Sequence, residues 1–408
     1  MICGLLGRKL GHSYSPLIHK ELGSYEYRLF EKEPDELEHF LRNGDFSGLN
    51  VTVPYKKTVI PYCDELSEQA KKIGAVNTLI RLADGRLIGH NTDCYGFHYM
   101  LEKAAIKLKN KKVLVLGSGG ASATVVSVLH DNGAIPIVIS RSGENNYDNL
   151  YLHYDASVIV NATPVGMYPD VNATPVDLTP FTKLEGVLDL IYNPSHTELL
   201  QQAEARGLIT ENGLWMLVAQ AKESAEWFAG KKISDDIIPC IHDRLQLETE
   251  NLVLIGMPGS GKSTVGKALA SALGKEFIDT DSLIVEEIGC SIPECFAKFG
   301  VAAFREIESS TIQKLGILSG KVIATGGGCV TIHDNYKPLH RNSTIIWLKR
   351  DLNQLPTDGR PLSQIGNLAE MYREREPLYT AFADFVVENS NINETVNTIL
   401  SLVKGVNK

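Results

Sequence analysis

The residues best suited to chemistry form two groups, and the later group begins at a glycine-rich stretch. Gly256-x-x-x-x-Gly261-Lys262-Ser263 follows the apolar run 252–255. This is the P-loop pattern, in which backbone N–H groups wrap a phosphate chain and the lysine reaches the β- and γ-phosphates. The serine would hold Mg²⁺, and the next helix would add its N-terminal dipole. The pattern predicts an ATP and Mg²⁺ site, against the alternative of a flexible turn, at Gly256, Gly259, Ser260, Gly261, Lys262, Ser263 and Thr264.

Two carboxylates follow the P-loop at a spacing that suits phosphoryl transfer. Asp279 and Asp281 end a predicted strand over 276–281, and alternation along a strand aims both side chains the same way. One carboxylate near Mg²⁺ and one near an acceptor hydroxyl is the arrangement that this chemistry uses. A pair of turn or helix-capping aspartates is the alternative interpretation.

Arginines and glycines further along could hold an acidic substrate. Arg305 and Arg375 lie on helical stretches, and planar guanidinium groups are natural receptors for carboxylates. Arg360 lies in a polar, proline-bearing segment suited to a lid, where an arginine can stabilise the transferring phosphate. The run Gly326–Gly328 follows a strand and permits close backbone approach to a ligand. For each arginine alone, a solvated surface side chain is the alternative.

The earlier group gathers polar residues at predicted strand ends. It contains two serines, a threonine, two amides, a lysine and an aspartate, namely Ser13, Ser15, Thr52, Asn77, Asn91, Lys56 and Asp93. Each one alone has an ordinary explanation, such as a helix cap, a turn former or a solvated lysine. Together they could hold a small, highly hydroxylated ligand and move a proton on it.

A second glycine-rich stretch predicts a dinucleotide site. Gly117-x-Gly119 follows a strand and opens a helix, although Ser122 stands at the third small position of the fingerprint. Arg141 ends the next strand, where an acid would indicate NAD, and its guanidinium could pair with a 2′-phosphate. We therefore predict NADP, with a solvated loop arginine as the alternative. The predicted cofactor-binding residues are Gly117, Ser118, Gly119, Gly120, Ala121, Ser140, Arg141, Leu190 and Gly213.

Hydrophobic periodicity places the earlier group on α/β elements. The strands expected in the first part cover 2–6, 49–53, 73–80 and 87–93, and those of a buried parallel dinucleotide-binding sheet cover 112–116, 135–140, 158–163 and 186–192. Three helices are expected in the first part. One begins at Pro16, a second covers 95–108, and a third runs from the turn at Gly119 to Leu129. A last helix, with its apolar face on Leu214, Leu217, Ala221, Ala225 and Phe228, places Gln220 beside the cleft.

The later group has its own pattern of strands and helices. The charged segment 231–250 should end the first part and serve as a linker region. A helix is expected from Lys262 to Leu273, ending at Gly274. The expected strands are 252–255, 276–281, 321–324, 344–349 and 385–387. Alternation of strands and helices implies a small, doubly wound P-loop domain.

Composition narrows the class of protein. The chain has 408 residues, 43% hydrophobic and 22% charged, which is typical of soluble globular proteins with two or three domains. The net charge of −9, without a basic run, argues against nucleic acid as a partner. Its seven scattered cysteines indicate reduced thiols and no zinc site. Neither a signal peptide nor a membrane span is expected, so we predict a cytoplasmic location. A monomer or homodimer is expected.

Motifs of the first part occur together in the order of a known family. They are Gly11-His-Ser-Tyr-Ser-Pro-Leu, Asn50-Val-Thr-Val-Pro-Tyr-Lys56, Gly74-Ala-Val-Asn-Thr78, Asn91-Thr-Asp93, Gly117-Ser-Gly-Gly-Ala121, Asn161-Ala-Thr-Pro-Val-Gly-Met167 and Gly213–Gln220. Over residues 1–245 the chain resembles shikimate dehydrogenase. The resemblance implies that Lys56 and Asp93 transfer the proton, and that shikimate is held by Ser13, Ser15, Thr52, Asn77, Tyr192 and Gln220. The chain departs from the family at 143–147, where relatives usually have a helix with a second basic residue.

Motifs of the second part resemble shikimate kinase over residues 250–408. They are Gly-Met-Pro-Gly-Ser-Gly-Lys-Ser at 256–263, Asp279-Thr-Asp281, Phe304-Arg305, Thr325-Gly-Gly-Gly328, Arg360-Pro-Leu and Arg375-x-Pro-Leu-Tyr379. The resemblance implies that Asp281 is the base at the acceptor hydroxyl and that Arg360 is the lid residue. Substrate would be held by Arg305, Arg375, Gly326, Gly327 and Gly328, and the metal by Ser263 and Asp279.

Both resemblances name the same molecule. We therefore expect a bifunctional α/β enzyme that reduces 3-dehydroshikimate with NADPH and then phosphorylates shikimate with MgATP. The expected domains are a substrate subdomain of 1–101 plus 212–245, a Rossmann-like NADP subdomain of 102–211, a linker of 246–250 and a P-loop kinase domain of 251–408. The alternatives are one half acting as a regulatory or structural module, a nucleic-acid or signalling ATPase, and quinate or another ring acid as the first substrate.

Overall fold

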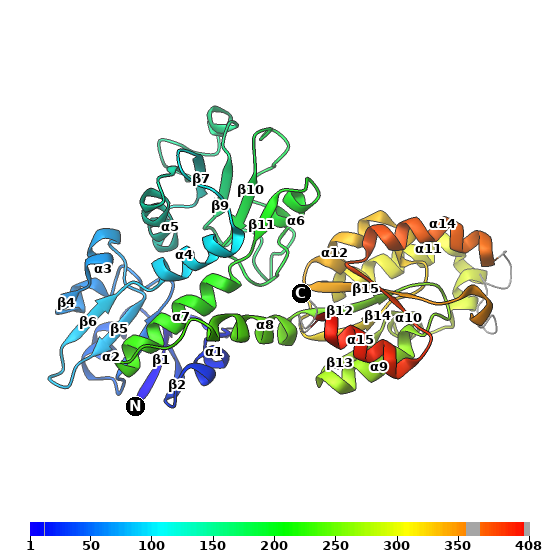
Figure 1. Cartoon of the computed structure of the whole chain (residues 1–408), viewed down its shortest axis with the longest axis horizontal. Helices are drawn as coiled ribbons and strands as arrows, with labels where there is room; N and C mark the ends of the chain where they lie inside the picture. Colours follow the sequence, from blue (N-terminus) through cyan, green and yellow to red (C-terminus); the bar gives the residue numbers. More distant parts are fainter. Residues whose placement is uncertain (12, 356–367, 404–408) are drawn as a thin grey trace. The chain divides into compact units, whose positions relative to one another are not determined.

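A computed structural model describes residues 1–11, 13–355 and 368–403. Contacts between residues divide the chain into two compact units (Figure 1). The first consists mainly of Met1–Met167, Asn172–Tyr192 and Leu199–His242, and the second mainly of Asp243–Lys408. None of the helices in the described ranges combines the length and the hydrophobic content needed to cross a bilayer.

The N-terminal sheet of the first unit is mixed. Its strand order is β2-β1-β3-β5-β6-β4, with antiparallel pairing of β3 with β5 and of β5 with β6. The strands are β1 (Ile2–Gly7), β2 (Glu26–Glu31), β3 (Gly48–Val51), β4 (Glu65–Leu66), β5 (Thr78–Arg81) and β6 (Leu87–His90). Helices α1 (Ser15–Leu22), α2 (Leu37–Asn43) and α3 (Glu68–Ile73) connect them. The predicted helix at Pro16 is present, and a turn with Gly85 at φ 90° joins β5 to β6.

Three predicted strands of this sheet are shorter than the sequence pattern indicates. The strand expected to stop at Pro54 ends at Val51, and Val53 is 74% exposed. The strand expected over 73–80 starts too early, because residue 73 is still the last residue of α3. Ser67 caps the start of that helix, and Gly74 ends it with φ at 68°. The strand expected over 87–93 ends at His90, and Asp93 already opens a helix. Thr52 and Asp93 therefore lie on a loop and at a helix start just after strands, and Asn77 lies on the loop just before β5.

The second sheet of this unit is entirely parallel, as the buried apolar runs predict. Its order is β11-β10-β9-β7-β8. The strands are β7 (Lys112–Leu116), β8 (Ile135–Ile139), β9 (Val158–Asn161), β10 (Gly186–Asp189) and β11 (Ile209–Glu211). The accompanying helices are α4 (Asp93–Ala104), α5 (Gly120–Asp131), α6 (Glu198–Glu204) and α7 (Leu214–Ala229).

Helices α4 and α7 approach closely because of one glycine. A Cβ on Gly96 would lie 2.5 Å from the carbonyl oxygen of Met216 and 2.9 Å from Cβ of Gln220. No side chain fits in that space. The contact brings Gln220 on α7 beside Asp93 at the start of α4.

The second unit contains a parallel sheet of order β13-β14-β12-β15-β16. Its strands are β12 (Asn251–Ile255), β13 (Glu276–Asp279), β14 (Lys321–Ala324), β15 (Ser343–Lys349) and β16 (Phe385–Glu388). Its helices are α9 (Lys262–Leu273), α10 (Thr280–Ile288), α11 (Ile292–Leu315), α12 (Tyr336–His340), α14 (Leu368–Phe382) and α15 (Ile392–Val403). Alternate residues of β12 pack toward α9 and α15 on one face and toward α11, α12 and α14 on the other (Figure 1). The predicted doubly wound α/β fold is confirmed.

The segment 231–250, expected to serve as a linker region, contains helix α8 (Ile237–Thr249), because Ile238, Ile241 and Leu245 recur at helical spacing and are buried. Its role as a linker stays a prediction. One expectation for the later part is wrong. The strand predicted over 276–281 ends at Asp279, whose carboxylate caps α10 by accepting from the N–H of Ser282 at 3.2 Å. Asp281 is therefore placed by the first turn of a helix and not by strand alternation.

Candidate active sites

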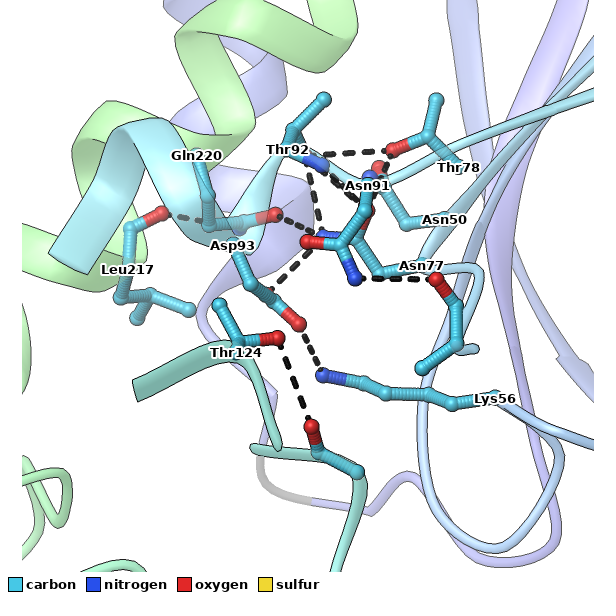
Figure 2. Close-up of polar contacts among 12 residues, drawn as sticks. Asn50, Lys56, Asn77, Thr78, Asn91, Thr92, Asp93, Thr124, Leu217 and Gln220 are labelled. Atoms are coloured by element: carbon cyan, nitrogen blue, oxygen red, sulfur yellow. Dashed lines mark hydrogen bonds and ion pairs between the residues drawn. The ribbon is translucent and has the colours of Figure 1, made fainter. Parts of the chain in front are cut away.

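The structure brings Lys56 and Asp93 into direct contact. Nζ of Lys56 donates to Oδ2 of Asp93 at 2.6 Å, and the two side chains are 18% and 7% exposed (Figure 2). Lys56 follows β3, whereas Asp93 opens α4. A largely buried, charge-assisted hydrogen bond of this kind holds an ammonium proton at a defined place beside Asp93.

Asn77 orients the carboxylate of this pair. Its Oδ1 accepts from the N–H of Thr92 at 2.7 Å and from Oγ1 of Thr78 at 3.1 Å. Its Nδ2 donates to Oδ1 of Asp93 at 2.9 Å and lies 3.4 Å from Oε1 of Gln220 (Figure 2). The donors on one side of the amide fix which side faces Asp93. Asn77, predicted to hold substrate, therefore contacts the predicted catalytic aspartate directly, and Gln220 is linked to it through Asn77.

The remaining predicted substrate residues lie on neighbouring loops of the same unit. Oγ of Ser13 donates to Oγ of Ser15 at 3.1 Å at the start of α1. Tyr192 joins them through Tyr14, since the two rings lie 5.3 Å apart between centroids. Burial raises the pKa of Tyr192 to about 12, so its hydroxyl keeps its proton at neutral pH. Thr52 donates its N–H to the carbonyl of Leu6 at the end of β1.

The glycine-rich turn after β7 leaves its backbone open to a ligand. Gly117 has φ at 103°, a Cβ on Gly119 would meet no atom within 4 Å, and α5 begins without a side-chain cap. These features suit a pyrophosphate at a helix N-terminus. A Cβ on Gly120 would lie 3.6 Å from Lys56, so the loop is next to the Lys56–Asp93 pair. Gly213 and Leu190 touch each other, since a Cβ on Gly213 would lie 2.0 Å from the Leu190 carbonyl oxygen.

Arg141 is exposed after β8, and the segment that follows is not helical. Asparagines close it into a compact loop. Asn146 donates its N–H to Oδ1 of Asn149 at 2.8 Å, and Oδ1 of Asn145 pairs with Nε2 of His153 at 2.8 Å. Residues 143–147, where the sequence departs from the family pattern, therefore form a loop and not a helix.

The P-loop has the backbone geometry that its glycines predict. Gly256, Gly259 and Gly261 all have positive φ, at 145°, 85° and 95°. Nζ of Lys262 donates to the carbonyl oxygens of Gly256 at 2.8 Å and of Met257 at 3.0 Å. The side chain is thereby held inside the loop.

The predicted metal ligands also lie together. Oγ of Ser263 donates to Oδ2 of Asp279 at 2.6 Å, while Oδ1 of Asp279 caps α10. Both Ser263 and Thr264 are exposed in the first turn of α9. A hydroxyl and a carboxylate at the mouth of a P-loop form an oxygen donor set that suits Mg²⁺. Helix capping and metal binding are therefore compatible roles for Asp279.

The predicted acceptor site is built around three glycines. A Cβ on Gly326 would lie 2.7 Å from Oδ1 of Asp281, and a Cβ on Gly328 would lie 1.8 Å from Nη2 of Arg305. A Cβ on Gly327 would strike the ring of Pro258 in the P-loop at 2.6 Å, so the two loops touch. Burial raises the pKa of Asp281, and the nearby Lys262 ammonium opposes the shift.

Arginines border this site. Nη1 of Arg375 donates to the carbonyl oxygen of Gly327 at 3.0 Å, and its side chain is largely buried. Nη1 of Arg305 pairs with Oε2 of Glu308 at 2.5 Å. Arg360 lies outside the described residues, and its role as a lid residue stays a prediction.

The sequence interpretation missed residues that support the P-loop and the glycine run Gly326–Gly328. Glu308 is fully buried and orients Arg305, and its Oε1 has no hydrogen-bond partner among the described residues. The i, i+3 spacing of Arg305 and Glu308 on one helix could have indicated this pair. No comparable sequence pattern indicates Thr280. Its Oγ1 accepts a hydrogen bond from the N–H of Gly326 at 3.0 Å. Asn389 also contacts the P-loop, by donating from Nδ2 to the carbonyl oxygen of Ser260.

Comparisons with known proteins agree with this geometry. A family model described as "Shikimate dehydrogenase substrate binding domain" matches residues 5–79, and one described as "Shikimate kinase" matches residues 258–404. A protein named shikimate dehydrogenase (NADP(+)) from Clostridium perfringens is 36% identical over 265 residues, covering 60% of this chain and 97% of that protein. Its counterpart from Methanococcus maripaludis is 37% identical over 258 residues, covering 57% and 92%.

Solved structures give the same assignment. A chorismate mutase/shikimate 5-dehydrogenase fusion protein from Clostridium acetobutylicum is 41% identical, with a TM-score of 0.56, covering 60% of this chain and 96% of that one. Shikimate 5-dehydrogenase from Thermus thermophilus, in complex with NADP(H) and shikimate, is 31% identical, with a TM-score of 0.55, covering 60% and 99%. The chain therefore belongs to the shikimate dehydrogenase family in its first part and continues into a shikimate kinase domain, so that two enzymes share one polypeptide.

Proposed function

We propose that the first part reduces 3-dehydroshikimate to shikimate and that the second part converts shikimate to shikimate 3-phosphate. The observation that carries the first proposal is the 2.6 Å contact between Lys56 and Asp93 beside the cofactor loop. When bound, NADPH supplies a hydride to the ring ketone. Lys56 donates a proton to the oxygen that becomes an alkoxide, and Asp93 holds the ammonium in place. Ser13, Ser15, Thr52, Tyr192 and Gln220 bind the ring substituents, and Asn77 contacts both Asp93 and substrate.

The second site is proposed to work by positioning and charge. Bound MgATP supplies the phosphoryl group. Ser263 and Asp279 hold the metal, Lys262 contacts the phosphates, and Asp281 accepts the proton of the attacking hydroxyl. Arg305, Arg375 and the run Gly326–Gly328 hold the substrate carboxylate and ring.

Several further expectations remain proposals. They are the domain limits of 1–101 plus 212–245, 102–211 and 251–408, a cytoplasmic location, a monomer or homodimer, and the absence of nucleic-acid and membrane partners. Because α8 includes 246–249, we propose that the linker of 246–250 is largely the last turn of this helix.

One incubation tests both activities. The full chain with 3-dehydroshikimate, NADPH and MgATP should form shikimate first, and shikimate should then fall as its phosphate accumulates. Without MgATP the reaction should stop at shikimate, and without NADPH neither product should form. ATP turnover that is independent of shikimate would contradict the kinase proposal, and faster turnover of quinate in a panel of ring acids would contradict the choice of substrate.

Arg141 should set the preference for NADPH. Replacing it by alanine should raise the KM for NADPH roughly 10- to 100-fold and leave the KM for NADH nearly unchanged, because a charge-assisted hydrogen bond contributes roughly 1.5–3 kcal/mol. Steady-state kinetics with both cofactors measures this, and kinase activity in the same chain is the control. A wild-type chain that uses NADH as well as NADPH would show that this interpretation of Arg141 is wrong.

A further inference from the structure

Asn389, the first residue after β16, is in direct contact with the P-loop. Its side chain is 6% exposed, and its Nδ2 donates to the carbonyl oxygen of Ser260 at 2.6 Å. A Cβ on Gly261 would lie 2.4 Å from the same nitrogen. The amide therefore packs against the peptide that joins Ser260 to Gly261, and only glycine at 261 permits this approach.

The position of Asn389 is fixed from two other elements. Its N–H donates to the carbonyl oxygen of Lys349, the last residue of β15, at 2.7 Å. Its Oδ1 lies 3.0 Å from Oγ1 of Thr395, which is 2% exposed in the first turns of α15. Because the Ser260 carbonyl can only accept, the amide nitrogen must be the atom that faces the loop. The sheet and α15 thus hold a donor at one defined point under the P-loop.

Holding this carbonyl also orients the neighbouring N–H. In a planar trans peptide, the C=O of Ser260 and the N–H of Gly261 point in opposite directions. With its oxygen on Asn389, the peptide turns the Gly261 N–H away from Asn389. In P-loops the backbone N–H groups face the phosphates. Gly261 has φ at 95° and, like any glycine, has little steric resistance to a peptide flip. A flipped peptide would aim its carbonyl oxygen at the phosphates.

We propose that Asn389 is a positioning residue for nucleotide binding, which keeps the Ser260–Gly261 peptide turned so that its N–H faces the phosphates. The inference rests on the proposed kinase function of the second unit. It gives the segment after β16 a role on the phosphate side of the nucleotide site.

Neutral substitutions test this without changing the charge near the phosphates. Asn389→Leu keeps the branched shape of the side chain without its polar atoms, and Asn389→Ala removes the amide. Each should weaken MgADP binding, measured by calorimetry on the full chain, about tenfold, as expected for the loss of one hydrogen bond. The KM for ATP should rise equally, while shikimate affinity without nucleotide should stay within twofold. Thr395→Val, which leaves the amide in place, should give the same selectivity with a smaller loss.

The controls separate this proposal from a general effect on the fold. Asn397 is exposed on α15, so Asn397→Leu should leave MgADP affinity unchanged, and dehydrogenase activity should persist in every variant. MgADP affinity within twofold of wild type in Asn389→Leu would overturn the proposal, and so would equal losses for MgADP and shikimate. Failure of the wild-type chain to phosphorylate shikimate would instead overturn the proposed function.

Discussion

Replacing Lys56 by alanine should reduce the rate of 3-dehydroshikimate reduction by about 10²- to 10⁴-fold, the range typical of losing a general acid. Asp93 pairs with the ammonium group of Lys56 at 2.6 Å. Among the described residues no second lysine contacts Asp93, so none could replace Lys56 as the proton donor. Asp93 keeps its hydrogen bond from Asn77 at 2.9 Å, so its carboxylate should keep its position. Loss of NADPH absorbance measures the reduction, and the rate of shikimate phosphorylation by the same chain should be unchanged.

Lys57 provides the matched control for this variant. It is the next residue, it is exposed, and Lys57→Ala removes the same charge from the same loop. That variant should reduce 3-dehydroshikimate at the wild-type rate. If Lys56→Ala also kept most of its activity, the proton would have to come from another group, and the role proposed for the pair would be wrong.

Replacing Asp281 by asparagine should reduce the rate of shikimate phosphorylation by a similar factor, about 10²- to 10⁴-fold, because an amide cannot accept the proton of the attacking hydroxyl. Reduction of 3-dehydroshikimate should be spared. Since burial raises the pKa of Asp281, the carboxylate is protonated at a higher pH than an ordinary aspartate. The rate of shikimate phosphorylation should therefore decline on acidification while ordinary aspartates are still ionised, as a pH profile of kcat/KM would record.

Glu286 is the control for Asp281, because it is exposed on the same helix and Glu286→Gln makes the same carboxylate-to-amide change. This variant should phosphorylate shikimate normally. Comparable kinase rates in Asp281→Asn and Glu286→Gln would exclude Asp281 as the base. Loss of both activities in either variant would indicate a defect in folding and not in chemistry.

Features carried by local sequence could be predicted well. The helix from Lys262 to Leu273 and its end at Gly274 are confirmed at both termini, because a glycine-rich turn and a left-handed glycine cap are properties of a few adjacent residues. The parallel strands of both nucleotide-binding sheets follow from short, continuous apolar runs. The contact of Lys56 with Asp93 was inferred from family motifs, since they lie 37 residues apart.

Features that depend on distant contacts could not be predicted in the same way. Alternation placed Asp281 on a strand, but the cap formed by Asp279 begins a helix one residue earlier. Asn77 has the sequence surroundings of a strand residue, and its amide is oriented by Thr92, which is adjacent only in the fold. Asn389 has no motif, and its role arises from a carbonyl 129 residues away. In each case the deciding interaction joins segments whose proximity no local pattern records.

The two carboxylate oxygens of Asp279 have different partners, with Ser263 on one side and the start of α10 on the other. The same side chain thus belongs to the proposed cation site and also supports the start of α10, where Asp281 lies in the first turn. A shift of this carboxylate on cation binding would be transmitted to the proposed base, Asp281, through a single helical turn. Any free energy shared in this way is reciprocal, so nucleotide and acceptor would each increase or decrease the other's affinity by the same factor.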